Sequence, residues 1–123
     1  MASRIKKKIN AMLKIGGRVV EIPEIVVCKG FEKVRGLMFS RSDYSHALLF
    51  EFSNDTDAPI HSFFCPQFLA IWLDENNKIV DYKVVSPNRF SVAPQKPFRK
   101  LIEIPINKKY SSIVDFILER GKV

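Results

Sequence analysis

The amino-acid sequence predicts a mainly β protein with one or two short helices (an α+β class), arranged as a compact antiparallel sandwich or a partly closed barrel. β-Branched and aromatic residues gather in short runs, and several runs alternate apolar with polar residues, as strands do. Clusters of Gly, Pro, Asn and Asp separate the runs, which is typical of turns. Because 123 residues with 46% hydrophobic content can bury one core, we expect a single β-rich domain over residues 10–123.

The first element has two possible structures, because residues 4–15 can form either a helix or a strand. Four apolar residues at helical spacing favour a helix that ends at Gly16-Gly17, namely Ile5, Ile9, Met12 and Leu13. In the alternative, Gly16-Gly17 is the two-residue turn of a β-hairpin, which needs positive φ at both positions. We favour the hairpin, with strands at Met12–Ile15 and Arg18–Ile22.

Three further strands are expected in the first half of the chain. Ile25–Cys28 is β-branched and has the composition of a buried strand. Ala47–Phe52 alternates large apolar residues with others, and Ile60–Phe64 forms a third run. Between the first two strands, Phe31–Arg35 can make a helical turn. Between the second and third, Asn54–Pro59 has the composition of a turn.

The clearest hairpin lies in the second half of the chain. Phe68–Leu73 is apolar throughout, which fits a strand covered on both faces. Ile79–Val85 alternates and returns antiparallel to it. The residues between them form the turn, in which Asn77 can adopt a positive φ.

A last strand and a short helix complete the expected fold. Arg99–Ile106 places three isoleucines on one face of a strand. Ser111 or Ser112 can then cap a helix that runs through Glu119.

Most of the net charge of +7 lies at the N-terminus. The first 14 residues contain five basic residues and no acidic ones, so the rest of the chain carries only +2. We therefore expect residues 1–9 to be a basic, partly ordered tail. Such a tail can contact nucleic-acid phosphates weakly, through Arg4, Lys6, Lys7 and Lys8. It can also be a solubilising tail, which is the explanation we favour.

The sequence favours a cytoplasmic protein that does not enter a membrane. No apolar run approaches the roughly 18 uncharged residues of a spanning helix. The basic N-terminus is not followed by the apolar region and cleavage site of a secretory signal. Cys28 and Cys65 lack the spacing of a disulfide framework, and two free thiols fit a reducing compartment.

Short motifs occur in the order and spacing of one uncharacterised family. They are Arg35-Gly36-Leu37-Met38-Phe39, Leu48-Leu49-Phe50-Glu51-Phe52, Ile71-Trp72-Leu73-Asp74 with Ile79-Val80, and Leu101-Ile102-Glu103-Ile104-Pro105. Together they resemble the domain of unknown function 192 family, and Ile60-His61 is similar to the archaeal-type members. The resemblance runs from about Gly17 to Pro105 and implies a compact β-rich fold. It implies no activity, because none is established for the family.

One stretch departs from the family pattern. Many members carry Asn-Thr and Pro-Leu-Asp before the strand that holds Trp72, whereas Phe63–Ala70 of this chain contains neither Asn nor Asp. If those polar residues line a site in the relatives, that site is lost or changed here.

Four residues are possible soft metal ligands, namely Cys28, His46, His61 and Cys65. A tetrahedral zinc site would need all four to converge, and closely spaced cysteine pairs are missing, so we favour unliganded cysteines and expect no cofactor. Cys65 could instead be a nucleophile with His61 as its base. The apolar neighbours of Cys65 disfavour the thiolate that this chemistry requires.

Glu51 and Glu103 interrupt otherwise apolar strands. Two carboxylates on neighbouring strands can serve acid–base chemistry. The alternation of the strands instead favours side chains that point to solvent on the outer faces of the sheet, and this is the interpretation we adopt.

A candidate ligand pocket lies near the Gly36–Met38 turn. Basic side chains around this turn could receive an anion, helped by backbone N–H groups. With three residues from later strands, the candidate residues are Lys33, Arg35, Arg41, His61, Cys65 and Glu103.

The sequence contains none of the common catalytic or nucleotide-binding motifs. We therefore predict a small non-enzymatic binding or accessory domain whose partner is an unknown small ligand or a protein. Nucleic-acid association through the basic arm is the first alternative, and a small-molecule enzyme with a pocket near the Gly36–Met38 turn is the second.

Overall fold

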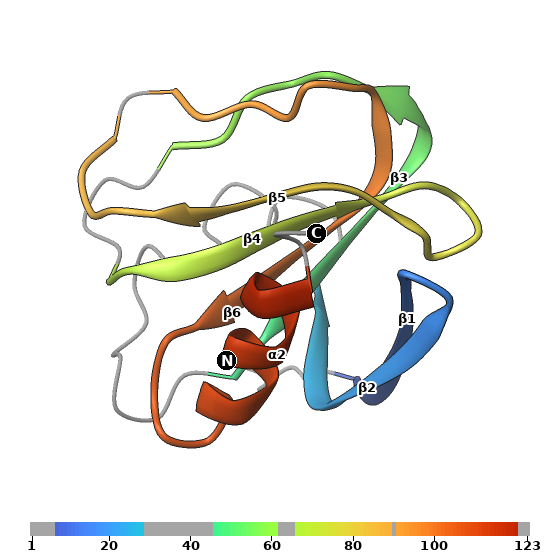
Figure 1. Cartoon of the computed structure of the whole chain (residues 1–123). Coiled ribbons are helices and arrows are strands. Elements are labelled where there is room, and N and C mark those ends of the chain that lie inside the picture. The colour runs from blue at the N-terminus through green and yellow to red at the C-terminus, as the bar shows by residue number, and fades with distance from the viewer. Residues whose placement is uncertain (1–6, 29–45, 62–65, 90, 121–123) are drawn as a thin grey trace, which may run out of the picture.

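The structure is a computed structural model that describes residues 7–28, 46–61, 66–89 and 91–120. These residues form six strands and a helix (Figure 1): β1 Lys8–Ile15, β2 Arg18–Cys28, β3 Leu48–Thr56, β4 Phe68–Leu73, β5 Ile79–Val85, β6 Phe98–Pro105 and α2 Ser111–Arg120. The expected helical turn at Phe31–Arg35 lies outside the described residues, as does most of the expected strand at Ile60–Phe64.

The six strands form one sheet in the order β1-β2-β3-β6-β4-β5. The sheet is strongly curled into a half-barrel, with β1 and β5 at its two edges (Figure 1). The predicted mainly β class is confirmed, and the partly closed barrel describes the fold better than the sandwich. One pair departs from the expected antiparallel arrangement, because β2 and β3 run parallel with Val26 opposite Leu48. Parallel neighbours need a long connection, and the residues between Cys28 and Leu48 supply it.

The N-terminal hairpin is confirmed and the helical alternative is wrong. Gly16 and Gly17 adopt φ angles of +54° and +76°. Positive φ at both positions is the hallmark of a type I′ turn, which twists in the same sense as the strands it joins. β1 begins at Lys8, so the sheet includes the last two residues of the expected tail.

β2 is longer than expected because a bulge lets it continue past a proline. The register between β1 and β2 shifts between Ile9 and Ala11, so that Pro23 and Glu24 lie opposite Asn10. Proline is tolerated in a sheet at such a bulge, where no ladder hydrogen bond is needed. Glu24 adopts a φ of +56°, and its N–H donates to Asn10 Oδ1 at 3.2 Å. The expected strand at Ile25–Cys28 is therefore the second half of β2.

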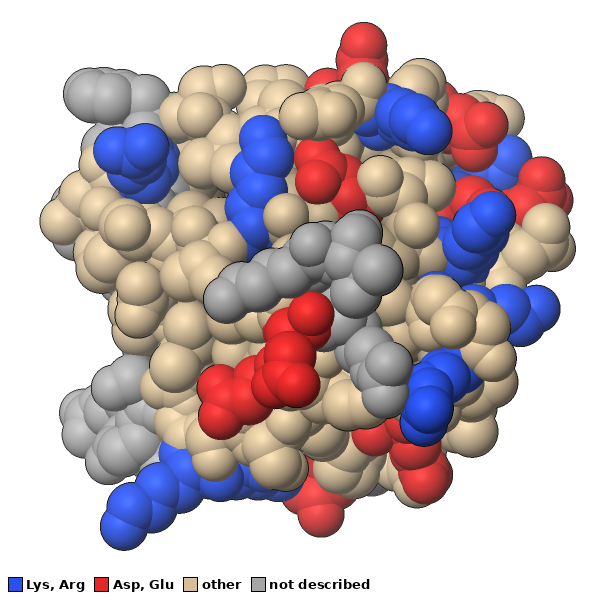
Figure 2. Space-filling view, in the orientation of Figure 1, with Lys and Arg blue, Asp and Glu red and all other residues tan. Residues whose placement is uncertain are grey.

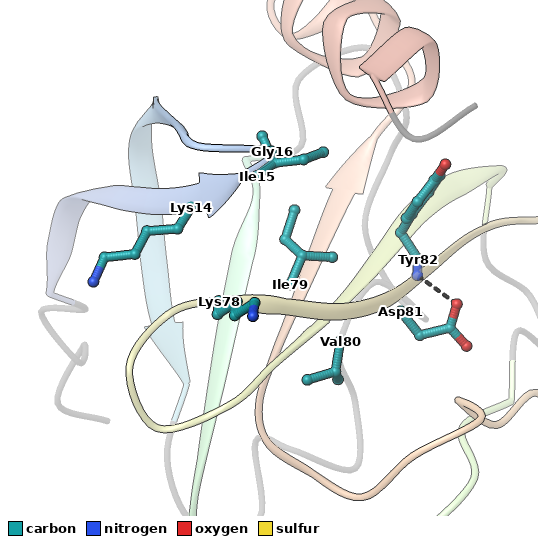
Figure 3. Close-up of a pocket in the computed structure, with 8 residues that line it drawn as sticks. All are labelled: Lys14, Ile15, Gly16, Lys78, Ile79, Val80, Asp81 and Tyr82. Carbon is teal, nitrogen blue, oxygen red and sulfur yellow. Dashed lines mark hydrogen bonds between the residues drawn. The ribbon is translucent and has the colours of Figure 1, made fainter. Parts of the chain in front are cut away.

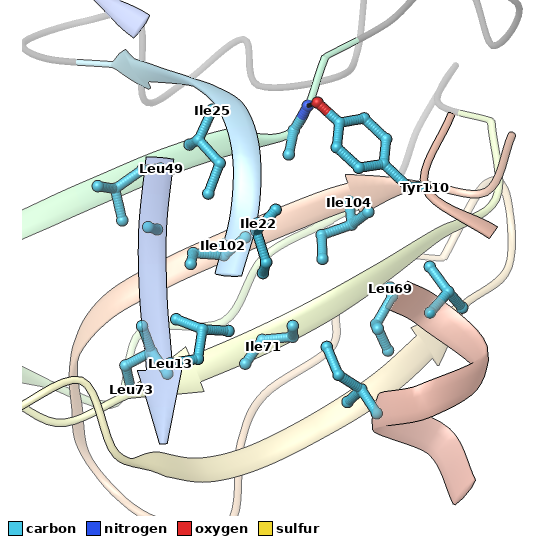
Figure 4. Packing of buried hydrophobic residues seen from close by; sticks show 14 of the residues in the cluster. Leu13, Ile22, Ile25, Leu49, Leu69, Ile71, Leu73, Ile102, Ile104 and Tyr110 are labelled. Atoms are coloured by element: carbon cyan, nitrogen blue, oxygen red, sulfur yellow. Dashed lines mark hydrogen bonds between the residues drawn. The ribbon is translucent and has the colours of Figure 1, made fainter. Parts of the chain in front are cut away.

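Two hydrophobic clusters cover the two faces of the curled sheet. The concave cluster includes Leu13, Ile71 and Ile102, and α2 packs into it through Val114 and Ile117 (Figure 4). The convex cluster includes Phe68, Trp72, Phe98 and Leu101. All six residues of β4 are buried, which confirms the prediction that this strand is covered on both faces.

Tyr110 connects the helix to the sheet. Its side chain is fully buried in the concave cluster, just before α2. The hydroxyl accepts a hydrogen bond from Ala47 N–H at 3.0 Å and lies 3.2 Å from the carbonyl oxygen of Pro23, to which it donates. A buried hydroxyl is expected to find such partners, and these fix α2 against the start of β3 and the bulge of β2.

Other boundaries differ modestly from the prediction. β3 extends to Thr56, so it takes up part of the expected turn at Asn54–Pro59. α2 spans Ser111–Arg120, close to the expected range. The Ser111 hydroxyl donates to Lys108 O at 3.3 Å, and just before the helix Tyr110 N–H donates to Asn107 Oδ1 at 3.2 Å.

Candidate functional site

The two edge strands of the half-barrel approach each other at the turn between β4 and β5. Lys14 N–H donates to Asn77 O at 3.0 Å, and Asn77 Nδ2–H donates to Met12 O at 3.2 Å. Asn77 adopts a φ of +65°, as its position in a tight turn allows. Two hollows lie beside this contact between β1 and the β4–β5 turn.

The first hollow, which we call the mouth, opens onto the concave face and has a volume of about 220 Å³. Its floor is apolar and includes Leu49, Leu73 and Ile102, which are buried in the concave cluster. Its remaining lining combines polar and apolar side chains, namely Ile9, Asn10, Ala11, Met12, Leu13, Glu51, Asn77 and Lys100. An apolar floor with a few convergent polar groups is the usual composition of a small-molecule site, and barrel mouths are common places for one.

Lys100 and Glu51 place opposite charges on neighbouring strands at the mouth. The two residues are register partners between β3 and β6. The Lys100 ammonium instead donates to Asn77 Oδ1 at 2.7 Å, and no ion pair within 4 Å joins Lys100 to any carboxylate that the structure describes. An ammonium has three donors, so Lys100 can bind a further acceptor while it keeps this bond.

The second hollow, of about 250 Å³, lies between the tip of the β1–β2 hairpin and β5 (Figure 3). Lys14 points away from its other lining residues in Figure 3. Asp81 is already engaged, since its carboxylate accepts bonds from Tyr82 N at 2.8 Å and Gln95 N at 2.9 Å. These bonds protect the exposed edge of β5, as edge strands require. The mouth therefore offers the more suitable polar groups of the two.

A polar cluster joins the bulge of β2, the residue before β3 and the segment before α2. Lys109 Nζ forms an ion pair with Glu24 and lies 2.8 Å from His46 Nδ1. The Lys109 ammonium holds the pKa of the Glu24 carboxyl below its ordinary value of 4.5. Burial lowers the pKa of the His46 imidazole below 6.5, and the Lys109 charge adds to this effect. A neutral His46 can accept the Lys109 hydrogen bond, so the cluster links three segments of the chain.

Of the six residues of the predicted pocket near Gly36–Met38, the structure describes only His61 and Glu103. Lys33, Arg35, Arg41 and Cys65 lie outside the described residues. His61 is half-buried and follows Ile60, which packs against the convex cluster. Glu103 is 6% exposed, and its register partners are Leu48 and Ala70 of that cluster.

The solvent-facing interpretation of Glu103 is therefore wrong. Alternation placed the side chain on the outer face of the sheet, but that face is covered by a second hydrophobic cluster. Glu51 is exposed as expected, although it lies at the mouth rather than on the outer face.

The possible soft ligands do not form a metal site within the part of the chain that the structure describes. Cys28 is a buried thiol in the convex cluster that forms no disulfide. His46 belongs to the Glu24–Lys109 cluster. No group of three or more potential ligands comes together in residues 7–28, 46–61, 66–89 and 91–120.

Sequence reasoning missed the mouth because its residues come from distant elements. The positive φ of Asn77 was foreseeable from its turn, but its contacts with Met12 and Lys100 join residues 65 and 23 positions apart. No local motif marks Lys100, which looks like an ordinary strand lysine.

Comparison with known sequences gives one relative from an uncharacterised family. No family model matches the chain. A UPF0127 protein of Thermococcus kodakarensis is 35% identical over 78 residues, which cover 61% of this chain and 48% of that protein. The match thus spans about half the length of the relative.

Two solved structures share the fold. A candidate transcription regulator of Sinorhizobium meliloti superposes with a TM-score of 0.66 at 16% identity, over 93% of this chain and 90% of that one. A protein of unknown function from Novosphingobium aromaticivorans has a TM-score of 0.66 at 12% identity, over 87% and 79% of the two chains. These comparisons identify no specific activity. In the described residues, no helix is long and apolar enough to cross a membrane.

Proposed function

We propose that this chain is a small non-enzymatic binding domain, and that the mouth of the half-barrel holds its ligand. The observation that carries the proposal is the meeting of an apolar floor with Lys100, Glu51 and Asn77 in one hollow. The described lining contains no Ser, Thr, Cys or His, the side chains that most often act as nucleophiles or imidazole bases. Binding therefore suits the mouth better than catalysis.

The volume limits the size of the ligand. An apolar cavity of about 150 Å³ holds benzene, and drug-sized ligands occupy roughly 300–1,000 Å³. At about 220 Å³ the mouth fits a metabolite the size of an amino acid. A branched aliphatic body would cover Leu49 and Ile102, while a carboxylate would meet the Lys100 ammonium.

A titration with three related compounds tests this proposal. Leucine, isovalerate and isoamylamine share an aliphatic body but differ in their charged groups. We expect leucine and isovalerate to shift the backbone amide resonances of Leu49, Leu73 and Ile102 saturably in NMR spectra, and isoamylamine to bind least. Lys100→Glu should weaken carboxylate binding by about tenfold or more, because it replaces a charge-assisted hydrogen bond with repulsion.

Lys96→Glu is the matched control, since Lys96 is exposed in a loop and does not line the mouth. It changes the net charge equally and should leave binding unchanged. Absence of saturable shifts at the mouth with all three compounds would refute the proposal, as would an equal loss in both variants.

We also propose that the chain belongs to the domain of unknown function 192 family, as a cytoplasmic member. The order of its motifs and its similarity to the UPF0127 protein support this assignment. The buried thiol of Cys28, which forms no disulfide, fits a reducing compartment. An alignment of close homologues tests the assignment, and it should place Gly36-Leu37-Met38 and Leu101–Pro105 on the family's signature positions.

Nucleic-acid association through the basic arm is the second candidate. It is supported by the exposure of Lys7 and Lys8, which follow the other basic residues of the arm directly in the sequence. Each phosphate contact adds about −0.9 to the slope of log K against log[salt] on duplex DNA. Removing residues 1–6, which takes away Arg4 and Lys6, should flatten this slope by about two; an unchanged slope would exclude phosphate contacts by these two residues.

The pocket near Gly36–Met38 remains a third candidate, supported by the burial of Glu103 on the convex face. Its other proposed members are Lys33, Arg35, Arg41, His61 and Cys65. Arg35→Gln should then abolish the binding of an anionic ligand without changing the affinity of the mouth for isovalerate. An equal loss of both would point to a folding defect instead.

A further inference from the structure

A third hollow lies outside the mouth, at the end of β5 and under the loop that follows it. Its volume is about 240 Å³. The lining combines two basic side chains with two hydroxyls, Lys83, Arg89, Ser86 and Ser91, and includes no acidic residue. In the upper left of Figure 2, over the end of β5 and this loop, basic patches occur without acidic ones between them.

The first limb of the loop is held by a turn. Pro87 and Asn88 are its two central residues, and Asn88 adopts a φ of +60°. Proline followed by a residue with positive φ is the pattern of a type II turn. The two ends of this turn are Ser86 and Arg89, so the turn presents both side chains on the lining of the same hollow.

The return limb is fixed by hydrogen bonds to two other elements. Lys83 Nζ donates to Ala93 O at 2.7 Å. Val92 exchanges two backbone hydrogen bonds of 2.8 Å with Ile60. Ser91 precedes this bridge directly, so its position is set before any ligand arrives. Such preorganisation lowers the entropy that binding must otherwise lose.

We infer that this hollow is a binding site for a phosphate group. Arg, Lys and Ser side chains supply only donors to an anion here, and the fork of a guanidinium matches phosphate oxygens. Arg89 and Ser86 have interactions of their own, but a guanidinium has five N–H donors and the Lys83 ammonium has two beyond its bond to Ala93. The nearest acid along β5, Asp81, is held by Tyr82 N and Gln95 N.

An NMR titration of the ¹⁵N-labelled full chain with inorganic phosphate, at constant ionic strength, tests this site. We expect saturable shifts of the amides of residues 86, 88, 89 and 91–93. Arg89→Gln should weaken binding by about tenfold, the loss of one charge-assisted hydrogen bond. Ser91→Ala should weaken it several-fold, and it keeps the site testable if the Arg89 variant unfolds.

Arg18→Gln is the charge-matched control, since Arg18 is exposed on the N-terminal hairpin. Non-saturating shifts, or equal weakening by Arg18→Gln and Arg89→Gln, would overturn the inference. A short single-stranded oligonucleotide distinguishes the sources of the phosphate. Shifts of the same amides that Arg89→Gln removes would assign the site to a nucleic-acid backbone, whereas shifts with inorganic phosphate alone would assign it to a free phosphate compound.

Discussion

Glu103 is buried because a hydrophobic cluster covers the convex face of the sheet. It is the charged side chain that is buried among the described residues, and it has an interaction partner. A buried polar side chain is costly unless it has a partner, and exchanging the carboxylate for an amide alters that interaction. We therefore expect Glu103→Gln to lower the free energy of unfolding by about 1–3 kcal/mol.

Glu51→Gln is the control for this prediction, because this substitution makes the same chemical change at an exposed position of the neighbouring strand. Its effect should stay within about 0.5 kcal/mol. Urea unfolding of both variants gives the comparison. Equal effects would mean that the Glu103 carboxylate makes no specific contribution.

The Glu24–His46–Lys109 cluster makes stability depend on pH. The pKa values of His46 and Glu24 are both lowered in the folded state, so the unfolded chain binds more protons than the native one. Stability should then be complete above about pH 6.5 and should fall on acidification, first through protonation of His46 and then, below 4.5, of Glu24. Thermal melts between pH 7.5 and pH 4 test whether Tm falls on acidification, as the burial of His46 requires.

His46→Gln removes the first titrating group and should flatten the decline that begins near pH 6.5. Glu24→Gln should leave that part of the curve and reduce the decline at lower pH. A Tm that rises on acidification from neutral pH would contradict the arrangement of the cluster.

The turn between β4 and β5 acts as the element that closes the half-barrel. Asn77 supplies a positive φ, a bond to Met12 O and an acceptor for Lys100. Asn77→Gly keeps the backbone conformation but loses both side-chain bonds, so it should cost about 1–2 kcal/mol. Asn77→Ala loses the same bonds and adds strain of about 1 kcal/mol, because alanine disfavours positive φ.

The expected order of stability is therefore wild type, Asn77→Gly and Asn77→Ala, measured by urea unfolding. Amide exchange of Lys14 should accelerate in the variants, since its N–H donates to Asn77 O. An Asn77→Ala variant as stable as Asn77→Gly would show that the turn does not need its left-handed backbone.

Elements with a strong local pattern were predictable from sequence. The uninterrupted apolar run and the alternating run gave the observed bounds of β4 and β5. The prediction divided β2 into Arg18–Ile22 and Ile25–Cys28, whereas the bulge opposite Asn10 lets the strand continue past Pro23. The parallel pairing of β2 with β3 has no local signal at all, since it depends on how the two strands meet in the sheet.

The candidate site was less predictable for the same reason. The register between β3 and β6 brings Glu51 opposite Lys100, and the β4–β5 turn then adds Asn77. Sequence periodicity gives the face of each strand but not its neighbour. It therefore identified Glu51 as an interruption without showing that a lysine lies beside it.

At the scale of the whole molecule, β4 and β6 form a shared wall between the two hydrophobic clusters. Ile71 and Ile102 face the concave cluster, while Trp72 and Leu101 face the convex one. A residue and its neighbour along the same strand thus belong to different clusters. Because neither strand can unfold for one cluster and stay folded for the other, the two clusters should form one cooperative unit.

A substitution that leaves a cavity in the concave cluster tests this cooperativity, because the response can be measured in the convex cluster on the other face of the sheet. Ile117 is fully buried in α2, so Ile117→Ala should destabilise the protein by about 2–5 kcal/mol. Trp72 is the sole tryptophan and lies in the convex cluster, so its fluorescence reports on that cluster alone. If the wall couples the clusters, the urea midpoints from Trp72 fluorescence and from far-UV circular dichroism should move together in Ile117→Ala. A fluorescence midpoint that stays at the wild-type value while the dichroism midpoint falls would mean that the two faces unfold independently.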